Sequence, residues 1–400
     1  MSRVLVHALA ATSGGGLTYL RNFLRWIVDA GSEHEWFVLV SPGLSVQLPE
    51  ADHLHYLNPP AVGSGLRRAL FDQVELRRLI ATHRIDLLLA TANFGMIRPP
   101  VPQILLNRNA LYFSSDHIRE LRRRRAVREL LQTVFRRQIA VASIRSSAIN
   151  VVPTAAFAEE IQEWLSPRDD VRFEVVPFGF DHAGFARPID DAKREMLRSA
   201  LSTKPGVRRI LLVSHYNYFR NFDTVFRAFA LLKSRLSEPV ELILTTKLEQ
   251  GHREHRYDTS DAARLLSSLG LSDDVTMLGS VSHDQLPCLY GEADIVVCAS
   301  YAESFGHPMV EAMACGRPLV VADRGVHREI CRDAALTFST FDAESLAYRF
   351  SQILNDRELA CSLGEKGRKR AADFSWNQHF RQFLGLVELA LKDGVHAHVE

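Results

Sequence analysis

The chain has 400 residues, which predicts two or three domains, because a single hydrophobic core rarely grows so large. Its 48 Lys and Arg nearly balance 47 Asp and Glu, and a formal net charge of +1 gives no field that would favour nucleic acid. The hydrophobic content of 46% is ordinary for a soluble globular protein. No apolar run approaches the roughly 18 residues that a membrane-spanning helix needs.

The cysteines predict a reducing compartment. They are Cys288, Cys298, Cys315, Cys331 and Cys361. Their number is odd and no two form a C-x-x-C pair, so reduced and mostly buried thiols of a cytosolic protein are favoured over a disulfide or zinc framework. The chain starts M-S-R-V-L-V-H-A, where one Arg and an interrupting His indicate a first strand rather than a signal peptide.

Apolar runs of strand length alternate with helical patterns along the chain. The first series of predicted strands is 4–8, 36–40, 85–90, 104–106 and 149–152, and the second is 210–213, 242–244, 275–278, 295–299 and 319–321. A helix is predicted over 17–30, with its apolar residues on one face and Gly31 as its stop. Two such alternating series predict two doubly wound α/β domains, with ligands at the carboxyl ends of the strands.

Two carboxylates follow the predicted strand 295–299 in the segment E-S-F-G-H-P-M-V-E, residues 303–311. Pro308 suits a first helical turn and Gly316 suits a helix stop. Glu303 is therefore placed in a strand-to-helix loop and Glu311 near the start of the helix. An ordinary capped helix with two surface Glu residues is the alternative interpretation.

The start of this predicted helix is a candidate anion site. Backbone N–H groups around Ser304, Phe305 and Gly306 are expected to point out of its positive end, where a diphosphate would be stabilised. The carboxylates of Glu303 and Glu311 can accept hydrogen bonds from hydroxyl groups. An anion cradle beside two such acceptors suits a nucleotide sugar.

The segment E-S-F-G-H-P-M-V-E-A-M-A-C-G-R-P-L-V-V resembles the signature of family 4 glycosyltransferases, and the resemblance covers residues 293–323. It implies a retaining hexosyltransferase of GT-B architecture, with two Rossmann-like domains facing each other across a cleft. Residues 1–180 would form the acceptor domain, joined by a crossing helix at about 376–400. Residues 181–375, after the bend at P-F-G-F-D, would form the donor domain, and the polar segment 247–261 is expected to be an exposed loop.

The resemblance also assigns the cations that bind the donor diphosphate. In the family, two basic residues follow the first strand of the second domain. Here His215 takes the first place and Arg220, followed by Asn221, takes the second. Arg220 can grip phosphate oxygens bidentately, although a solvated loop Arg is the alternative. His215 departs from the family's Arg.

Two segments of the first domain are further candidates. Gly14, Gly15 and Gly16 follow the first strand, and the family has a similar glycine loop that faces the donor diphosphate and the acceptor. A plain flexible turn is the other interpretation of the glycines. Arg108 stands about where many family members have a His facing the reacting carbon, so a catalytic role and a structural role both stay open.

The resemblance implies same-face attack, in which the leaving diphosphate helps to deprotonate the acceptor. Arg220 would stabilise that diphosphate, Glu303 would place the sugar ring and Glu311 would accept from the ribose hydroxyls. No Asp-x-Asp follows a predicted strand, so no metal and no other cofactor is expected, with a UDP-sugar or GDP-sugar as donor. A non-catalytic nucleotide-sugar-binding protein and another GT-B enzyme, such as a sugar-nucleotide epimerase, are the rivals.

An Arg-rich stretch lies between Arg119 and Arg145 and includes the run Arg122–Arg125. Apolar residues at helical spacing among the cations predict a helix with one buried face. The favoured interpretation is a solvated basic face. The alternative is peripheral contact of a cytoplasmic enzyme with an anionic membrane or with a lipid-linked acceptor at the inner membrane face.

Overall fold

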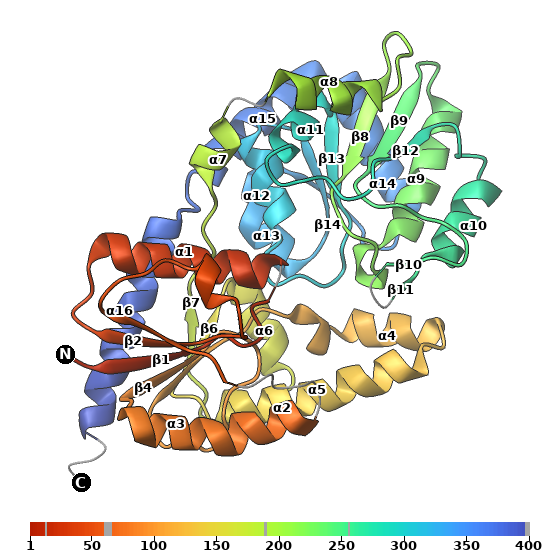
Figure 1. Ribbon diagram of the computed structural model, residues 1–400. Helices are drawn as coiled ribbons and strands as arrows, with labels where there is room; N and C mark the ends of the chain where they lie inside the picture. Colours follow the sequence, from red (N-terminus) through yellow and green to blue (C-terminus); the bar gives the residue numbers. More distant parts are fainter. Residues whose placement is uncertain (13, 60–65, 188–189, 255–256, 397–400) are drawn as a thin grey trace. The chain divides into compact units, whose positions relative to one another are not determined.

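The structure is a computed structural model that describes residues 1–12, 14–59, 66–187, 190–254 and 257–396 (Figure 1). The chain divides into two compact units. Unit 1 comprises residues 1–113, 126–179 and 376–400, and unit 2 comprises residues 114–125 and 180–375.

Unit 1 is built on a seven-stranded parallel sheet in the order β3-β2-β1-β4-β5-β6-β7. Its strands are β1 (Arg3–His7), β2 (Glu35–Leu39), β3 (Leu54–Leu57), β4 (Leu87–Ala90), β5 (Gln103–Leu106), β6 (Ile149–Val152) and β7 (Phe173–Val175). The central strands are buried almost throughout, because helices cover both faces of the sheet (Figure 1).

The helices of unit 1 are α1 (Gly14–Ala30), α2 (Leu66–Leu70), α3 (Leu76–His83), α5 (Val127–Arg145), α6 (Ala155–Gln162) and α16 (Trp376–His396). A π-helical segment (Phe71–Glu75) joins α2 to α3, and a 3-10 turn covers Ala110–Tyr112. The predicted apolar face of α1 is buried, and Gly31 ends the helix in the left-handed region at φ +66°.

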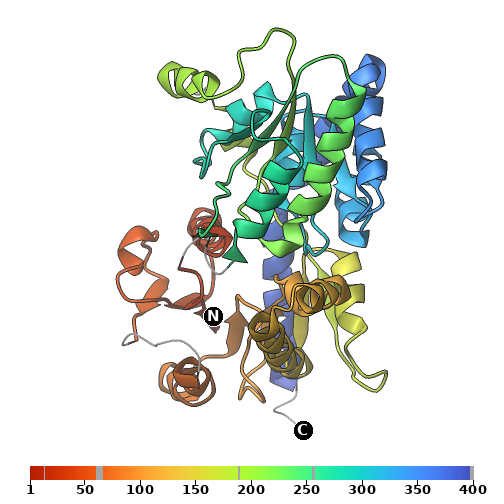
Figure 2. The ribbon, with the colours of Figure 1, turned by 90° about the vertical axis from the view of Figure 1, so that its right-hand side faces the viewer.

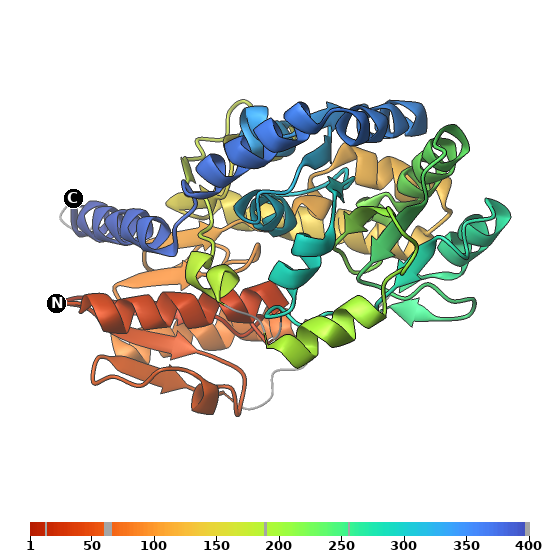
Figure 3. The same ribbon diagram turned by 90° about the horizontal axis from the view of Figure 1, so that it is seen from above.

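The last helix, α16, packs on α1, β4 and β5 of unit 1. Aromatic rings form this contact, since the Phe23 ring lies 5.4 Å from that of Phe380 and 5.8 Å from that of Phe383. Trp26 Nε1 also donates to Asn377 Oδ1 at 3.2 Å. The start of β1 and the end of α16 lie at the same end of the unit (Figures 1 and 3).

Unit 2 is built on a six-stranded parallel sheet in the order β12-β9-β8-β13-β14-β15. Its strands are β8 (Arg208–Leu212), β9 (Val240–Leu244), β12 (Val275–Met277), β13 (Ile295–Cys298), β14 (Leu319–Ala322) and β15 (Leu336–Phe338). The chain steps outward from β8 to β9 and then returns to the other side of β8 with β13. The neighbouring pair β8–β13 is therefore the topological switch point, where doubly wound sheets bind ligands.

The helices of unit 2 are α4 (Ser115–Arg123), α7 (His182–Ala186), α8 (Asp191–Ser199), α9 (Phe222–Arg235), α10 (Ser260–Ser268), α11 (Leu286–Glu292), α12 (His307–Ala314), α13 (Gly325–Cys331), α14 (Ala343–Asn355) and α15 (Arg357–Ala371). Short 3-10 turns cover Tyr218–Arg220 and Arg332–Ala334. Helices α9 and α14 pack side by side on one face of the sheet (Figures 1 and 2). Asp190, Asp342 and Asp356 cap three of these helices by accepting from backbone N–H groups.

The structure differs from the sequence-based prediction in three respects. The short strands β3, β7 and β15 are additions to it. The polar segment 247–261, expected to be a loop, contains a small antiparallel hairpin of β10 (Arg253–Glu254) and β11 (Tyr257–Asp258). Helix α4, predicted as part of the first domain, clusters with unit 2.

Candidate active site

The loops that follow β8 and β13 carry most of the predicted site residues. After β8 come His215 and the 3-10 turn that ends at Arg220, and α9 begins two residues later. After β13 come Ser300 and Glu303, and then α12. Because β8 and β13 pair directly and in parallel, their carboxyl ends bring the two loops together at the switch point of unit 2.

Arg220 and Glu303 form an ion pair at this point, between Nη1 and Oε1. The pair is largely shielded from water, with side-chain exposures of 27% for Arg220 and 14% for Glu303. Ser300 Oγ donates to the same carboxylate at 3.1 Å. The predicted diphosphate cation and the predicted sugar-binding carboxylate therefore contact each other, so that a single ligand could reach both.

A narrow cavity lies against this ion pair. It is lined by Arg220, Ser300, Glu303 and His327, among other residues, and its volume of about 10 Å³ has room for roughly one water molecule. A cavity of this size cannot hold a diphosphate or a sugar beside the ion pair as it stands.

His327 was not predicted as a site residue. It is fully buried in α13, after β14, and its Nδ1 lies 2.8 Å from the carbonyl oxygen of Ala322. Burial lowers the pKa of the imidazole, so the ring is neutral, Nδ1–H donates to that carbonyl and Nε2 faces Ser300 Oγ at 3.5 Å. Ser300 can donate to Glu303 or to His327, which makes it a positioning residue. For Ser300, the signal in the sequence was its place just after the apolar run of β13.

Glu311 lies deeper than expected. It is the fifth residue of α12, in the second turn of the helix, and it is only 7% exposed. Burial raises the pKa of its carboxyl group, and a hydrogen bond from Tyr290 Oη at 2.7 Å counteracts part of that effect. The carboxylate is thus held by a buried tyrosine that the sequence did not single out.

The predicted anion cradle precedes α12. Gly306 occupies the N-cap position in the left-handed region at φ +86°, and Pro308 stands in the first helical turn. Ser304 is 9% exposed. The Phe305 ring is buried, and its centre lies 5.4 Å from the centre of the Phe374 ring. The left-handed residue explains why glycine stands before the helix, because a side chain there would be strained.

His215 and Asn221 bind protein groups in this structure. His215 Nδ1 lies 3.0 Å from Glu254 Oε1, and the other oxygen of Glu254 accepts from the Tyr216 N–H at 2.9 Å. Asn221 adopts φ +58°, donates to the Thr340 carbonyl at 2.6 Å and accepts from Thr224 Oγ1 at 2.7 Å. The Asn221 side chain therefore fixes the start of α9, and a donor contact through it stays a prediction.

The other predicted residues lie in unit 1. Gly14, Gly15 and Gly16 form the first turn of α1 rather than a loop before it. Arg108 donates from Nη2 to the Gly15 carbonyl at 3.0 Å, and its guanidinium lies 5.1 Å from the ring centre of Tyr19. Arg108 thus supports the glycine turn, and its role in catalysis stays a prediction.

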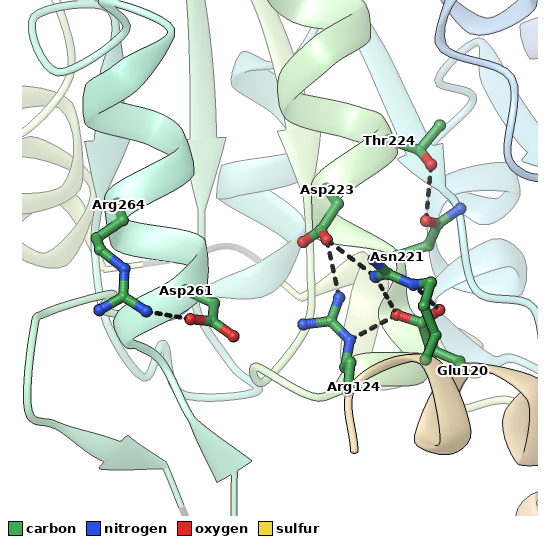
Figure 4. A network of polar contacts seen from close by, with 8 residues as sticks. Glu120, Arg124, Asn221, Asp223, Thr224, Asp261 and Arg264 are labelled. Atoms are coloured by element: carbon green, nitrogen blue, oxygen red, sulfur yellow. Dashed lines mark hydrogen bonds and ion pairs between the residues drawn. The ribbon is translucent and has the colours of Figure 1, made fainter. Parts of the chain in front are cut away.

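The Arg-rich run is divided between two roles. Arg124 pairs with Glu120 and, at 2.8 Å, with Asp223 at the start of α9 (Figure 4). It also lies 4.7 Å from the ring centre of Tyr218. Arg123 forms a bidentate pair with Glu120. Arg123 and Arg124 are therefore engaged within unit 2, where Arg124 joins α4 to α9. Arg122 and Arg125 are exposed.

Other site types find no support in the described part of the chain. Its His, Cys, Asp and Glu side chains form no cluster of three or more that could hold a metal ion. None of its helices is both long enough and apolar enough to cross a bilayer. All five cysteines are free thiols, and Cys361 is exposed.

The chain has the GT-B fold. Over 98% of its length it is similar to all of the sucrose-phosphate synthase of Thermosynechococcus elongatus, with a TM-score of 0.73 and 18% identity. Over 97% it is similar to the whole of HepE of Anabaena, solved with UDP-glucose, with a TM-score of 0.71 and 17% identity. The predicted fold class is therefore confirmed, and at these identities the likeness concerns the fold alone.

The chain is also similar in sequence to glycosyltransferases. A family model described as Glycosyl transferases group 1 matches residues 193–370. A D-inositol 3-phosphate glycosyltransferase of Salinispora arenicola is 32% identical over 226 residues, which is 55% of this chain and 50% of that protein. A mannosylfructose-phosphate synthase of Agrobacterium fabrum is 30% identical over 217 residues, 54% of this chain and 47% of that protein. The chain thus spans about half the length of these curated relatives.

Proposed function

We propose that this protein is a retaining glycosyltransferase that moves a hexose from a UDP-sugar or GDP-sugar to a hydroxyl group of a glycan, a lipid-linked acceptor or a small molecule. One observation carries the proposal. Arg220 and Glu303, the cation expected to bind the diphosphate and the carboxylate expected to bind sugar hydroxyls, meet at the switch point of unit 2. The match of residues 193–370 to a glycosyltransferase family model supports it.

In the proposed reaction, the donor replaces the ion pair. Arg220 turns to the diphosphate and stabilises the charge that develops as the sugar leaves, while the N–H groups before α12 bind the same anion. Glu303, released from Arg220 and oriented by Ser300, accepts from a sugar hydroxyl. Glu311 accepts from the ribose hydroxyls. The leaving diphosphate takes the proton of the acceptor on the same face of the sugar, so the anomeric configuration is retained.

The place of action is also part of the proposal. Five free thiols support a reducing compartment, the cytoplasm, and the acceptor would then be met in solution or at the inner face of a membrane. No other cofactor is proposed, since the nucleotide sugar is a substrate.

A non-catalytic nucleotide-sugar-binding protein is the second candidate, together with another GT-B enzyme such as an epimerase. The binding protein is favoured by His215, which stands where the family has Arg and which lies beside the carboxylate of Glu254. A donor site with one permanent cation would stabilise a leaving diphosphate less well.

A ligand screen separates these candidates. Melting temperatures with UDP, GDP, ADP and their common sugars identify the base. Anomeric NMR of the product from the best donor then tests transfer and retention. Stabilisation by a nucleotide sugar without hydrolysis or transfer would favour the binding protein, and no stabilisation by any nucleotide would refute the proposed donor site.

Turnover is expected to survive EDTA, because Arg220 and the N–H groups before α12 take the part that a metal plays in other glycosyltransferases. The measurement is the initial rate with and without an excess of EDTA, because a chelator removes a divalent ion on which turnover depends. Loss of turnover that manganese or magnesium restores would contradict this expectation and move the enzyme to another mechanistic class.

The variant Gly16→Ala is expected to keep the fold and lose turnover. A Cβ on Gly16 would lie 3.5 Å from Ala11 Cα, an ordinary contact, and Ala in a helix is worth up to about 1 kcal/mol over Gly. If the backbone of this turn approaches a ligand, the added methyl should displace it and cost about tenfold or more in kcat/KM. Unchanged kcat/KM with a raised Tm would leave the glycine as a plain turn residue.

A further inference from the structure

A second cavity of unit 2 has no part in the proposed transfer. Its volume is about 480 Å³, and small-molecule sites measure roughly 300–1,000 Å³. Its walls belong to α4, the loop after β14, the turn after β15 and α14, all of which are parts of unit 2. Among the described residues, none lines both this cavity and the narrow one at Arg220 and Glu303. A ligand of this cavity therefore binds outside the candidate donor site.

Three arginines from different elements line this second cavity: Arg119 of α4, Arg324 at the N-cap of α13 and Arg349 of α14. Arg119 Nη1 and Arg324 Nη1 donate to the two oxygens of the Asp116 carboxylate, at 2.7 and 2.6 Å. Arg349 Nε donates to the Thr337 carbonyl at 2.8 Å, and no carboxylate of the described residues pairs with this arginine. The Arg349 guanidinium is thus a half-buried cation without a counterion, which favours a bound anion.

The other carboxylates of the cavity leave it a small positive charge. Asp323 pairs with Arg328, and Asp342 caps α14 by accepting from the Ser345 N–H at 3.0 Å. With Arg328 included, four arginines stand against three aspartates, so the net charge of the group is +1. Asp323 and Asp342 are both exposed, and their carboxylates can accept from hydroxyl groups of a ligand.

Phe341 adds an apolar surface to this polar wall. Its side chain is 50% exposed, and its ring centre lies 5.4 Å from that of Tyr301. Ser339, Thr340 and Ser345 line the cavity as well. A sugar ring matches such a wall, because its C–H face packs on an aromatic ring while its hydroxyl groups exchange hydrogen bonds with carboxylates, hydroxyls and guanidinium groups.

We propose that this cavity binds a sugar that carries one anionic group, a phosphate or a carboxylate. Arg349 would hold the anion and the other two arginines would add positive charge, because the guanidinium fork matches both kinds of anion. Asp323 and Asp342 would accept from ring hydroxyls, and the C–H face of the ring would pack on Phe341. The proposal goes beyond the proposed transfer reaction and does not depend on it.

Two other ligands fit the cavity less well. A metal ion needs several ligating side chains close together, and the His, Cys, Asp and Glu side chains of the described residues form no cluster of three or more that could hold one. A neutral sugar would cover the Arg349 guanidinium without supplying the counterion that a desolvated cation needs.

Titration calorimetry with the full chain tests the proposal. The probes are glucose 6-phosphate and glucuronate, compared with glucose and inorganic phosphate. At least one of the two anionic sugars is expected to bind about tenfold more tightly than glucose or inorganic phosphate, and the tighter one identifies the anion. Excess UDP or GDP should leave this affinity unchanged, because the two cavities are separate. Displacement of the probe by either nucleotide would place it at the donor site and overturn the proposal.

Four variants test the contacts. Arg349→Gln should weaken binding of the anionic sugar about tenfold or more, the loss of one charge-assisted hydrogen bond, and Arg349→Lys should recover part of that loss. Phe341→Ser should weaken binding about threefold, because ring packing is lost. Arg119→Gln should also cost about threefold, since this arginine is 74% exposed and its charge is largely screened.

The matched control is Arg264→Gln on α10. Arg264 pairs with Asp261 three residues before it, as Arg119 pairs with Asp116, and it is 62% exposed. This variant should bind the anionic sugar like the wild type. Arg220→Gln should do so as well, which separates a failure of the donor site from a failure of this proposal.

The melting temperature of each variant shows whether its fold is intact. Should Arg349→Gln melt below the wild type, Phe341→Ser and Arg119→Gln, both at exposed positions, still decide the test. A wild type that binds neither anionic sugar, equally tight binding of inorganic phosphate, or unchanged affinity in either Arg349→Gln or Phe341→Ser would overturn the proposal.

Discussion

The variant Arg220→Gln is expected to lose about 100- to 1,000-fold in kcat, the usual effect of removing one preorganised group that stabilises a developing anion. Arg220 is the cation that meets Glu303 at the switch point, and glutamine has neither the charge nor the bidentate fork. Its removal also leaves the partly buried carboxylate of Glu303 without a cation, so a lower Tm is expected. Initial rates at saturating donor, together with Tm, measure both effects.

Two further variants make this test specific. Arg220→Lys keeps the charge but not the fork, and it should recover part of the lost rate and most of the Tm. Arg227→Gln removes an exposed arginine from the same helix, α9, and should leave the rate unchanged. A rate for Arg220→Gln within threefold of the wild type would show that another group holds the diphosphate.

The variant Glu311→Gln is expected to weaken nucleoside diphosphate binding by about 1.5–3 kcal/mol, because a charge-assisted hydrogen bond to the ribose is lost. The fold should not suffer, since the amide oxygen can still accept from Tyr290. Burial raises the pKa of Glu311 above its unfolded value, so the folded protein binds this proton more tightly. Wild-type stability therefore falls relative to the variant as pH rises from the ordinary carboxyl range to the raised pKa.

Calorimetry with the nucleoside diphosphate and thermal melts across pH check both parts. Glu303→Gln is the comparison, because it should weaken the intact nucleotide sugar while leaving the nucleoside diphosphate nearly unaffected. Wild-type affinity of Glu311→Gln for the nucleoside diphosphate would refute the ribose contact. A Tm well below that of the wild type at neutral pH would mean that the carboxylate is needed for folding instead.

The central strands could be predicted from the sequence because both of their faces are buried. In β4, β5 and β14 every residue is buried, and such strands read as continuous apolar runs. The strands β3, β7 and β15 lie at the edges of their sheets and are only partly buried, so their sequences lack that signal. The location of α4 could not be predicted either, since the partner of Arg124 in α9 is 99 residues away.

The local positions of the candidate residues could be predicted as far as local sequence reaches. The loops after β8 and β13, the glycine before α12 and the place of Glu311 within that helix follow from strand ends and helix starts, but the burial of Glu311 does not. The contact of Arg220 with Glu303 depends on the pairing of β8 with β13, which no local pattern encodes. The contacts of Ser300 with Glu303 and with His327 depend on the same packing, so neither residue was predicted as part of the site.

The ion pair between Arg220 and Glu303 has a consequence for the order of events in the proposed reaction cycle. In this pair each group neutralises the other, so Arg220 is not presented as a bare cation. On the proposed function, a complete nucleotide sugar would satisfy both groups at once, whereas a nucleoside diphosphate would engage Arg220 and leave Glu303 unmatched. After the proposed transfer, the carboxylate would compete with the spent diphosphate for the guanidinium, and re-formation of the pair would favour product release.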